Sequence, residues 1–238
     1  MSIPILMYHQ IDVPPPRGTR LRGLVVAPNS FIWQMKMLSF MGYKGLSMSD
    51  LEPYLMGYKH GKVVGITFDD GYCNNIENAL PVLMDHGFTA TCYGVSSLIG
   101  GTNIWDGGLV SEKPLMSLRD WQRWFKAGMD VGSHTRSHAK LTELPDVEAK
   151  AQIMDSKHEL ERAIGCEVRH FCYPYGAFCA THQQMVLESG YVTATSTHRG
   201  RVSLGDDPLA LKRVMVARAT HPLQFFLKVG TCYEDLRA

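Results

Sequence analysis

The chain has few features of a disulfide-stabilised or thiolate-metal protein. It contains only six cysteines in 238 residues, and no two of them form a CxxC pair. This scatter argues against a disulfide framework and a thiolate zinc site, and it favours buried, reduced thiols for most of them. The cysteines are Cys73, Cys92, Cys166, Cys172, Cys179 and Cys232.

Long apolar runs and excess charge are also missing. Each apolar run is strand-sized and is interrupted by His, Asp or Gly, so no transmembrane segment is expected. The N-terminal stretch MSIPILMYHQIDVPPP lacks the features of a secretory signal, so as written we expect a cytoplasmic protein. A periplasmic or extracellular location would follow if a signal had been removed. The net charge of +1 gives no reason to expect a nucleic-acid partner.

What the chain does have is an ordinary globular composition with a regular alternation of strands and helices. Hydrophobic residues make up 45% and charged residues 20%, enough apolar material for a single domain over residues 1–238. Strands are predicted at 3–9, 43–46, 63–68, 88–95, 129–134, 168–174, 191–197 and 211–216. Helices are predicted from Asn29-Ser30 to Gly42, from a cap at Ser49-Asp50 to about 58, at 74–87, 117–128, 146–164 and 181–190, and from Pro222.

This alternation predicts an α/β fold with a mainly parallel sheet covered by helices. About seven or eight such units favour a closed or distorted (β/α) barrel. In a barrel of this kind the functional groups lie beyond the carboxyl ends of the strands. Unusual polar residues do follow five predicted strands, namely Tyr8-His9, Asp69-Asp70, Trp105-Asp106, His134 to His138 and Tyr173 to Tyr175.

One strand ends on two neighbouring carboxylates in the stretch GITFDDGY, residues 65–72. Asp69 and Asp70 repel one another and are costly to desolvate, so a buried strand end needs a reason to carry both. Either they lie in a surface turn, or a site uses the two acids for different purposes.

The stretch GSHTRSH offers the complementary ligands. His134 and His138 have a spacing that can deliver two imidazoles to one metal, although an HxxxH pair alone is weak evidence in a chain with ten histidines. Two histidines and one carboxylate fit a hydrolytic zinc site and also a non-haem iron site. Only one aspartate is needed as a ligand, which leaves the other free to act as a base on water.

TFDDG, SHTRSH and FCYPYG, in this order and at this spacing, resemble the polysaccharide deacetylases of the NodB-homology type. The similarity covers roughly residues 60–200 and includes the stretches LPVLMDHGF, ATCYGV and SKHELERAIG. It implies a distorted (β/α) barrel and a metal-dependent enzyme that removes N-acetyl groups from glycans.

The resemblance also implies roles for individual residues. Asp69 would be the general base, and Asp70, His134 and His138 would hold a divalent metal, Zn²⁺ first and Co²⁺, Ni²⁺ or Fe²⁺ as alternatives. Tyr175 would contribute to the substrate site and supply a backbone N–H to the oxyanion. The local sequence around Tyr175 alone is equally consistent with a plain turn.

The chain departs from the usual family pattern at Cys172, which stands where most members have an arginine that orients the catalytic aspartate. Arg213, at the start of a late strand, is a candidate replacement. A surface arginine at a strand end is an equally good interpretation of that residue.

A second departure concerns the general acid, because the late Leu-x-His motif is missing. The N-terminal strand instead ends on His9, which resembles the circularly permuted branch of the family that includes poly-N-acetylglucosamine deacetylases. We therefore expect His9 to protonate the leaving amine, with a core histidine as the alternative.

Trp105 is expected to line the substrate groove because an aromatic face suits a sugar ring, with a core tryptophan as the alternative. The predicted function is thus metal-dependent removal of N-acetyl groups from N-acetylhexosamine units of a glycan. The alternatives are a deacetylase or deformylase of a lipid-linked or nucleotide sugar, a catalytically inactive glycan-binding module and, more remotely, a redox iron enzyme.

Overall fold

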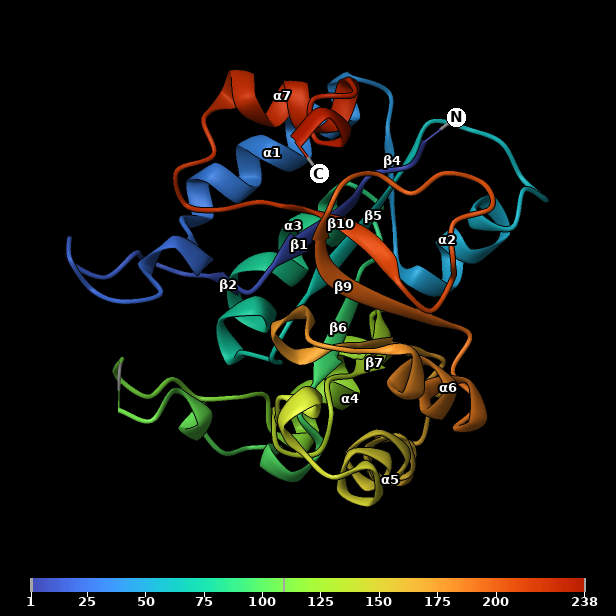
Figure 1. The fold of residues 1–238 in the computed structure, drawn as a ribbon. Helices are drawn as coiled ribbons and strands as arrows, with labels where there is room; N and C mark the ends of the chain where they lie inside the picture. The colour runs from blue at the N-terminus through green and yellow to red at the C-terminus, as the bar shows by residue number, and fades with distance from the viewer. Residues whose placement is uncertain (1, 109, 238) are drawn as a thin grey trace.

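The barrel strands form a closed parallel ring wrapped by helices (Figure 1). The computed structural model describes residues 2–108 and 110–237. In sheet order the ring runs β1, β10, β9, β8, β7, β6, β5, and pairing of β1 with β5 closes it. The predicted (β/α) barrel is therefore confirmed. The ring strands are β1 (Ile5–Tyr8), β5 (Val63–Phe68), β6 (Thr91–Gly94), β7 (Asp130–Ser133), β8 (His170–Cys172), β9 (Thr193–Arg199) and β10 (Leu211–Met215).

The eighth strand of this sheet, β4 (Lys44–Leu46), lies outside the closed ring. It pairs with residues 63–65 of β5, whereas β6 pairs with residues 67 and 68 of the same strand. Since β1 occupies the other edge of β5, β4 and β6 share one edge. Two short strands, β2 (Gln10–Ile11) and β3 (Val25–Val26), pair separately beyond β1.

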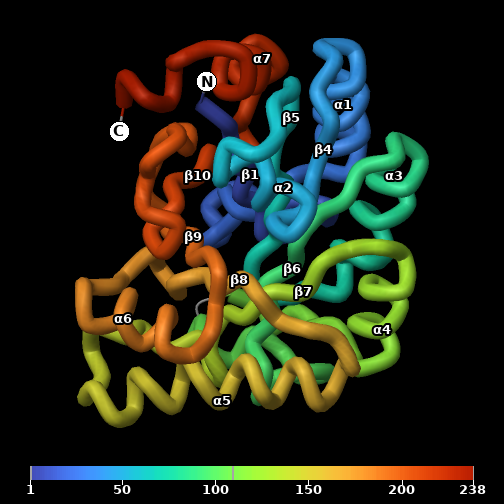
Figure 2. The backbone as a smooth tube through the Cα atoms, turned by 90° about the vertical axis from the view of Figure 1, so that its right-hand side faces the viewer, coloured from blue at the N-terminus to red at the C-terminus, as the bar shows by residue number. Residues whose placement is uncertain are grey.

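Helices pack around the outside of the ring (Figure 2). They are α1 (Pro28–Phe40), α2 (Met48–Leu55), α3 (Leu80–Asp85), α4 (Leu118–Lys126), α5 (Asp146–Ile164), α6 (Ala180–Glu188) and α7 (Pro222–Gly230). A π-helical segment, Asn75–Ala79, leads into α3, and the 3₁₀ turns are Arg22–Leu24, Ser96–Leu98, Ile104–Asp106, Leu141–Glu143, Pro174–Gly176 and Asp235–Arg237. Within 2–108 and 110–237, no helix combines the length and apolarity needed to cross a membrane.

Two predicted helix starts are wrong by one or two residues. The cap of α2 is Ser47, whose hydroxyl accepts a hydrogen bond from the Asp50 amide at 3.2 Å, rather than Ser49-Asp50. The first helix begins at Pro28, where proline fits because the first turn needs no N–H partner.

Aromatic packing between the sheet and helix α1 anchors β1 to its neighbour β5. Tyr8 stacks on Phe68 with ring centroids 5.5 Å apart, and Phe31 of α1 meets Tyr8 edge-on at 5.3 Å. All three side chains are fully buried, and each contributes roughly 1.5–3 kcal/mol of hydrophobic free energy. This packing holds the ends of β1 and β5 in place, and these ends are followed directly by His9 and by Asp69 and Asp70.

A buried polar cluster lies at the opposite, amino-terminal end of the strands. The Asp130 carboxylate accepts hydrogen bonds from the Thr91 hydroxyl at 2.9 Å and from the Ser49 amide at 3.3 Å. His170 bonds the Ser49 hydroxyl at 3.0 Å. Burial raises the pKa of Asp130 to about 6 and lowers that of His170 to about 3.

All six cysteines are free thiols, so the expected lack of a disulfide framework is confirmed. Only Cys92 and Cys172 are buried, whereas Cys179 and Cys232 are exposed. The expectation that most thiols are buried is therefore wrong. The exposed ones lie outside the strands, at the start of α6 and after α7.

Candidate active site

The polar residues predicted at the strand ends do meet at the carboxyl-terminal mouth of the barrel. Asp69 and Asp70 follow β5, His134 follows β7, and Tyr175 follows β8. This convergence is a consequence of parallel strands, whose carboxyl ends all lie on one rim.

Asp70, His134 and His138 form a compact three-residue cluster. Asp70 Oδ1 lies 3.4 Å from His134 Nε2 and 3.3 Å from His138 Nε2. All three residues are buried. Burial alone would raise the pKa of Asp70, but the two adjacent imidazoles hold it well below its ordinary value.

The geometry of this cluster fits a tetrahedral metal ion. With metal–ligand bonds of about 2.0–2.1 Å, neighbouring ligand atoms of a tetrahedron lie about 3.3–3.4 Å apart. The separations of Asp70 Oδ1 from the two imidazole nitrogens, 3.4 and 3.3 Å, match this edge length. Asp70 Oδ1 is also buried and accepts no hydrogen bond from the described residues, although an unpaired buried carboxylate oxygen is costly. A cation would satisfy it.

Neighbouring groups orient both imidazoles with Nε2 toward Asp70. His134 Nδ1–H donates to the Cys172 carbonyl at 2.8 Å, and His138 Nδ1 contacts the Tyr175 hydroxyl at 3.1 Å. Such bonds at the far nitrogen are typical of histidines that bind metals. Burial lowers the pKa of His138, which favours the neutral form that a metal requires.

Trp105 stacks on the imidazole of His138, with ring centroids 4.5 Å apart and an interplanar angle of 21°. It comes from the loop after β6 and is only partly buried, so it is not a core tryptophan. One face of the indole therefore supports His138, a contact that the sequence did not suggest.

Asp69 is held by a buried arginine. Arg213 of β10 donates from both terminal nitrogens to the two Asp69 oxygens, at 2.6 and 2.7 Å. Only 1% of Arg213 and 2% of Asp69 are exposed. Burial favours a higher pKa for Asp69, but the charge and hydrogen bonds of Arg213 outweigh it and lower the pKa.

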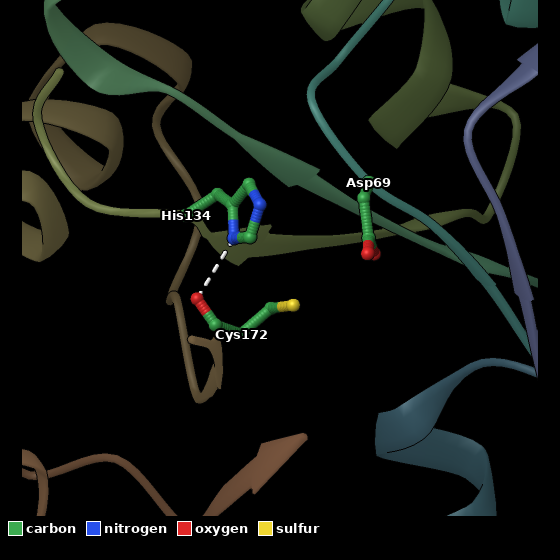
Figure 3. A group of neighbouring side chains, drawn as sticks. All are labelled: Asp69, His134 and Cys172. Carbon is green, nitrogen blue, oxygen red and sulfur yellow. Dashed lines mark hydrogen bonds between the residues drawn. The ribbon is translucent and has the colours of Figure 1, made fainter. Parts of the chain in front are cut away.

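The ion pair of Arg213 and Asp69 explains how this chain does without the arginine that most family members have at the position of Cys172. The guanidinium of Arg213 also donates to Cys172 Sγ at 3.1 Å, so the thiol lies where an arginine from β8 would otherwise reach Asp69. Figure 3 shows the Cys172 side chain directed toward Asp69 and its carbonyl directed toward His134. The small thiol leaves room for a guanidinium delivered by β10. Arg213 is thus not the surface residue that the sequence also allowed.

His9 also lies beside the Asp69 carboxylate. Its Nε2 is 3.9 Å from Asp69 Oδ2, and 17% of its side chain is exposed. The Asn75 side chain fixes the His9 backbone by donating to its carbonyl at 2.8 Å. His9 is therefore a partly accessible imidazole beside the carboxylate rather than an enclosed core histidine.

Left-handed backbone conformations are concentrated at this rim. Among the described residues, five positions other than glycine have positive φ, and Asp70 (75°), Thr135 (65°), His138 (60°) and Tyr175 (59°) are four of them. Such conformations cost of order 1–3 kcal/mol each and persist where the surroundings impose them. Here they aim the side chains of three separate motifs at one point.

The chain belongs to the polysaccharide deacetylase family. Residues 57–194 match the family model described as "Polysaccharide deacetylase". This range contains the aspartate pair, both histidines and Tyr175, whereas His9 and Arg213 lie outside it.

Named relatives agree with this assignment. YxkH of Bacillus subtilis (strain 168), whose name refers to the same family, is 29% identical over 91% of this chain and 72% of its own length. Poly-beta-1,6-N-acetyl-D-glucosamine N-deacetylase of Staphylococcus epidermidis is 25% identical over 83% of this chain and 70% of its own. Among solved structures, the Streptococcus pyogenes deacetylase PplD in complex with acetate is 26% identical, with a TM-score of 0.84 over 96% of this chain and 98% of that one.

Proposed function

We propose that this chain is a metal-dependent hydrolase that removes N-acetyl groups from N-acetylhexosamine units of a glycan. The observation that carries the proposal is the buried cluster of Asp70, His134 and His138 beside an ionised Asp69. The cluster has the donor set and spacing of a hydrolytic metal site, and Asp69 is the additional base that hydrolysis needs.

The metal would bind to Asp70 Oδ1 and to Nε2 of both histidines. Once bound there, a divalent cation supplies Lewis-acid polarisation of the acetamide carbonyl and lowers the pKa of the attacking water. Two nitrogens and one oxygen suit Zn²⁺, with Co²⁺, Ni²⁺ and Fe²⁺ as the alternatives.

Asp69 takes the proton from the water that attacks the acetamide carbon. Arg213 holds both carboxylate oxygens, so the base is kept ionised and in one orientation. The Tyr175 backbone N–H, following Pro174, is proposed to donate to the oxyanion that develops on the carbonyl oxygen.

His9 is proposed to protonate the departing nitrogen as the carbon–nitrogen bond breaks. The distance of 3.9 Å between His9 Nε2 and Asp69 Oδ2 supports this role, because an acid and a base that act on one amide group must lie close together. The products are acetate and a free amino sugar.

The substrate proposal draws on the relatives as well as on the site. The name of the Staphylococcus epidermidis relative states that it acts on poly-β-1,6-N-acetyl-D-glucosamine, and we propose a substrate of the same class here. Tyr175, a residue 54% exposed at the rim, is proposed to contact the sugar.

The test combines elemental analysis of the purified protein with acetate release from β-1,4- and β-1,6-linked N-acetylglucosamine oligomers. We expect about one divalent metal per chain, and Asp69→Asn should lose turnover while retaining the metal. Ser203→Ala, an exposed residue at the other end of the barrel, is the matched control. Normal turnover in Asp69→Asn would contradict the mechanism, and tight oligomer binding without acetate release in metal-loaded wild type would favour a binding module.

A further inference from the structure

A cavity of about 500 Å³ opens at the amino-terminal end of the barrel strands, away from the metal cluster. Val63, the first residue of β5, lines this cavity, whereas Asp69 follows the last residue of the same strand. The six residues of β5 separate the two by roughly 20 Å. The volume lies within the range of roughly 300–1,000 Å³ that is usual for small-molecule sites. We call this cavity the amino-terminal pocket.

Segments that are distant in the sequence form the amino-terminal pocket. Residues 57–62 follow α2, residues 2 and 3 precede β1, and residues 201–204 follow β9. In Figure 1 the N-terminus and α2 lie on the side away from the loop of residues 102–113. The amides of Ile3 and Val202 each donate to the carbonyl of the other residue, at 2.7 and 2.8 Å. Val202 is only 4% exposed, so this part of the floor is packed and the pocket is preformed.

The charged side chains of the lining are all of one sign. Among the described residues the lining includes no Asp or Glu, and its basic members are Lys59, His60, Lys62 and Arg201. Arg201 is paired with Asp235 at 2.8 Å, but the two lysines form no ion pair within residues 2–108 and 110–237. Since the whole chain has a net charge of only +1, this is a local concentration of positive charge. Such a concentration favours an anionic ligand.

Free backbone donors lie beside these ammonium groups. The amides of Tyr58 and Lys59 both donate to the Pro53 carbonyl, at 2.8 and 3.0 Å. The next three amides, those of residues 60–62, donate to no acceptor in the described parts of the chain. Ammonium and backbone N–H groups together are typical ligands of a phosphate group. The segment of residues 59–62 therefore offers a phosphate both kinds of donor.

Two tyrosine rings lie beside this cationic segment, and both line the pocket. The Lys62 ammonium lies 4.9 Å from the centroid of the Tyr43 ring, and the Tyr43 hydroxyl donates to the Val229 carbonyl at 3.1 Å. A Cβ added at Gly61 would lie 3.4 Å from the Tyr54 ring, so the segment also packs against Tyr54. Aromatic faces held next to cations suit a planar ring that carries a phosphate.

The basic groups line a concave pocket rather than a flat face. A pocket with an apolar floor and polar groups on one wall is the usual form of a small-molecule site. This shape favours a small organic phosphate over an extended anionic surface such as a lipid bilayer.

We propose that the amino-terminal pocket binds a nucleoside phosphate, with the phosphate on the segment of residues 59–62 and the base against Tyr43 and Tyr54. This site is independent of the proposed deacetylase function, because a ligand roughly 20 Å from Asp69 takes no part in the hydrolysis. A bound nucleotide would link the start of β5 to the connection between β9 and β10, and it should therefore stabilise the folded protein.

The test measures binding to the metal-loaded protein by isothermal titration calorimetry, with AMP, UMP, adenosine and inorganic phosphate as the ligands. Lys59→Gln/Lys62→Gln removes the two lysine charges of the pocket. The matched control is Lys36→Gln/Lys126→Gln, which removes two exposed lysines from α1 and α4. Urea midpoints of the ligand-free proteins check that the variants are folded.

Two further variants and a lipid arm separate the other possible modes of binding. Tyr54→Leu removes one aromatic wall but not the charges. Asp70→Ala removes a proposed metal ligand and so detects phosphate that binds at the metal cluster instead. Sedimentation with vesicles of phosphatidylcholine and phosphatidylglycerol measures binding to an anionic lipid surface.

Wild type and the matched control should bind AMP or UMP roughly tenfold or more tightly than they bind adenosine or inorganic phosphate. Lys59→Gln/Lys62→Gln should weaken nucleotide binding roughly tenfold or more, because charge-assisted hydrogen bonds are lost. Tyr54→Leu should weaken binding of the nucleotide and leave that of inorganic phosphate unchanged. Asp70→Ala should bind nucleotide as the wild type does.

The proposal would be overturned by unchanged nucleotide affinity in Lys59→Gln/Lys62→Gln, by loss of binding in Asp70→Ala, or by inorganic phosphate that binds as tightly as the nucleotides. Vesicle binding without nucleotide binding would identify a lipid-docking face and would equally overturn it. None of these measurements uses acetate release, so the pocket is tested whether or not the deacetylase function holds.

Discussion

Replacing Arg213 with methionine should destabilise the protein strongly and in a pH-dependent way. The substitution keeps most of the side-chain volume but leaves the Asp69 carboxylate buried without the two hydrogen bonds of 2.6 and 2.7 Å. Removing one member of a buried ion pair costs about 3–5 kcal/mol, and the near-complete burial of both residues places this pair in that class.

The pH dependence follows from the sign of the Asp69 shift. In the wild type its pKa lies below the ordinary value, so its contribution to stability is present above about pH 4 and is lost as the pH falls through the lowered pKa. Without Arg213, burial is opposed only by the weaker effects of His9 and His134, so the pKa of Asp69 should rise. The variant's carboxyl then protonates at a higher pH, and its deficit relative to wild type should shrink as the solution is acidified.

Urea unfolding of metal-free wild type and Arg213→Met at pH 8 and pH 5 measures both effects. Arg213→Met combined with Asp69→Asn removes both charges and should recover most of the loss, whereas Arg213→Lys keeps a charge but not the planar fork and should be intermediate. In acetate-release assays, the acid limb of the Arg213→Met profile should move to higher pH. A loss below about 1 kcal/mol, equal at both pH values, would refute the reasoning.

Three further outcomes are expected. Zn²⁺ added to the metal-free wild type should raise the free energy of unfolding by about 2.7 kcal/mol when its free concentration is a hundred times the dissociation constant. The same Zn²⁺ concentration should stabilise Asp70→Ala far less. Equal stabilisation of both proteins would contradict the assignment of Asp70 as a metal ligand. Gly94→Ala would put a Cβ 2.7 Å from the Trp121 ring and should cost about 1–3 kcal/mol in urea unfolding, so an unchanged midpoint would count against it. Asp130 has a pKa of about 6 in the native state, so it binds a proton at a higher pH there than in the unfolded chain, and the wild type gains stability as the pH falls from 6 to 4. Asp130→Asn lacks this gain and should lose stability relative to wild type by up to about 1.4 kcal/mol per pH unit. A difference between the two proteins that does not change with pH would argue against this.

Elements with strong local signals were predictable from the sequence. The 19-residue helix α5 has the predicted bounds, 146–164, because its C-cap glycine and its periodic apolar face are both local features. Phe40 at the end of α1 shows the limit of such patterns: it is a large apolar residue and yet 89% exposed, whereas Phe31, Met35 and Leu38 of the same helix are buried.

The parts of the candidate site that lie in short local motifs could be predicted from the sequence. The contacts between residues far apart in the sequence could not. The motif TFDDG predicted Asp69 and Asp70, and the HxxxH spacing in SHTRSH predicted His134 and His138. The contact of Arg213 with Asp69 spans 144 residues, and only the ring closure of β1 with β5 and β10 brings these strands together. The stacking of Trp105 on His138 likewise depends on a loop conformation that no local pattern encodes.

The pairing of the first ring strand, β1, with the last, β10, has a consequence for how the site is assembled during synthesis. The proposed metal ligands come from β5 and β7 and the turns that follow them, so they can approach one another before β10 is made. The side of the site that holds Asp69 is different, because one edge of β1 stays unpaired until β10 is made, and Arg213 arrives on that last strand. A nascent chain paused after β9 would therefore contain all three proposed metal ligands but would hold Asp69 without its arginine, so the proposed base is completed only when the last strand is added.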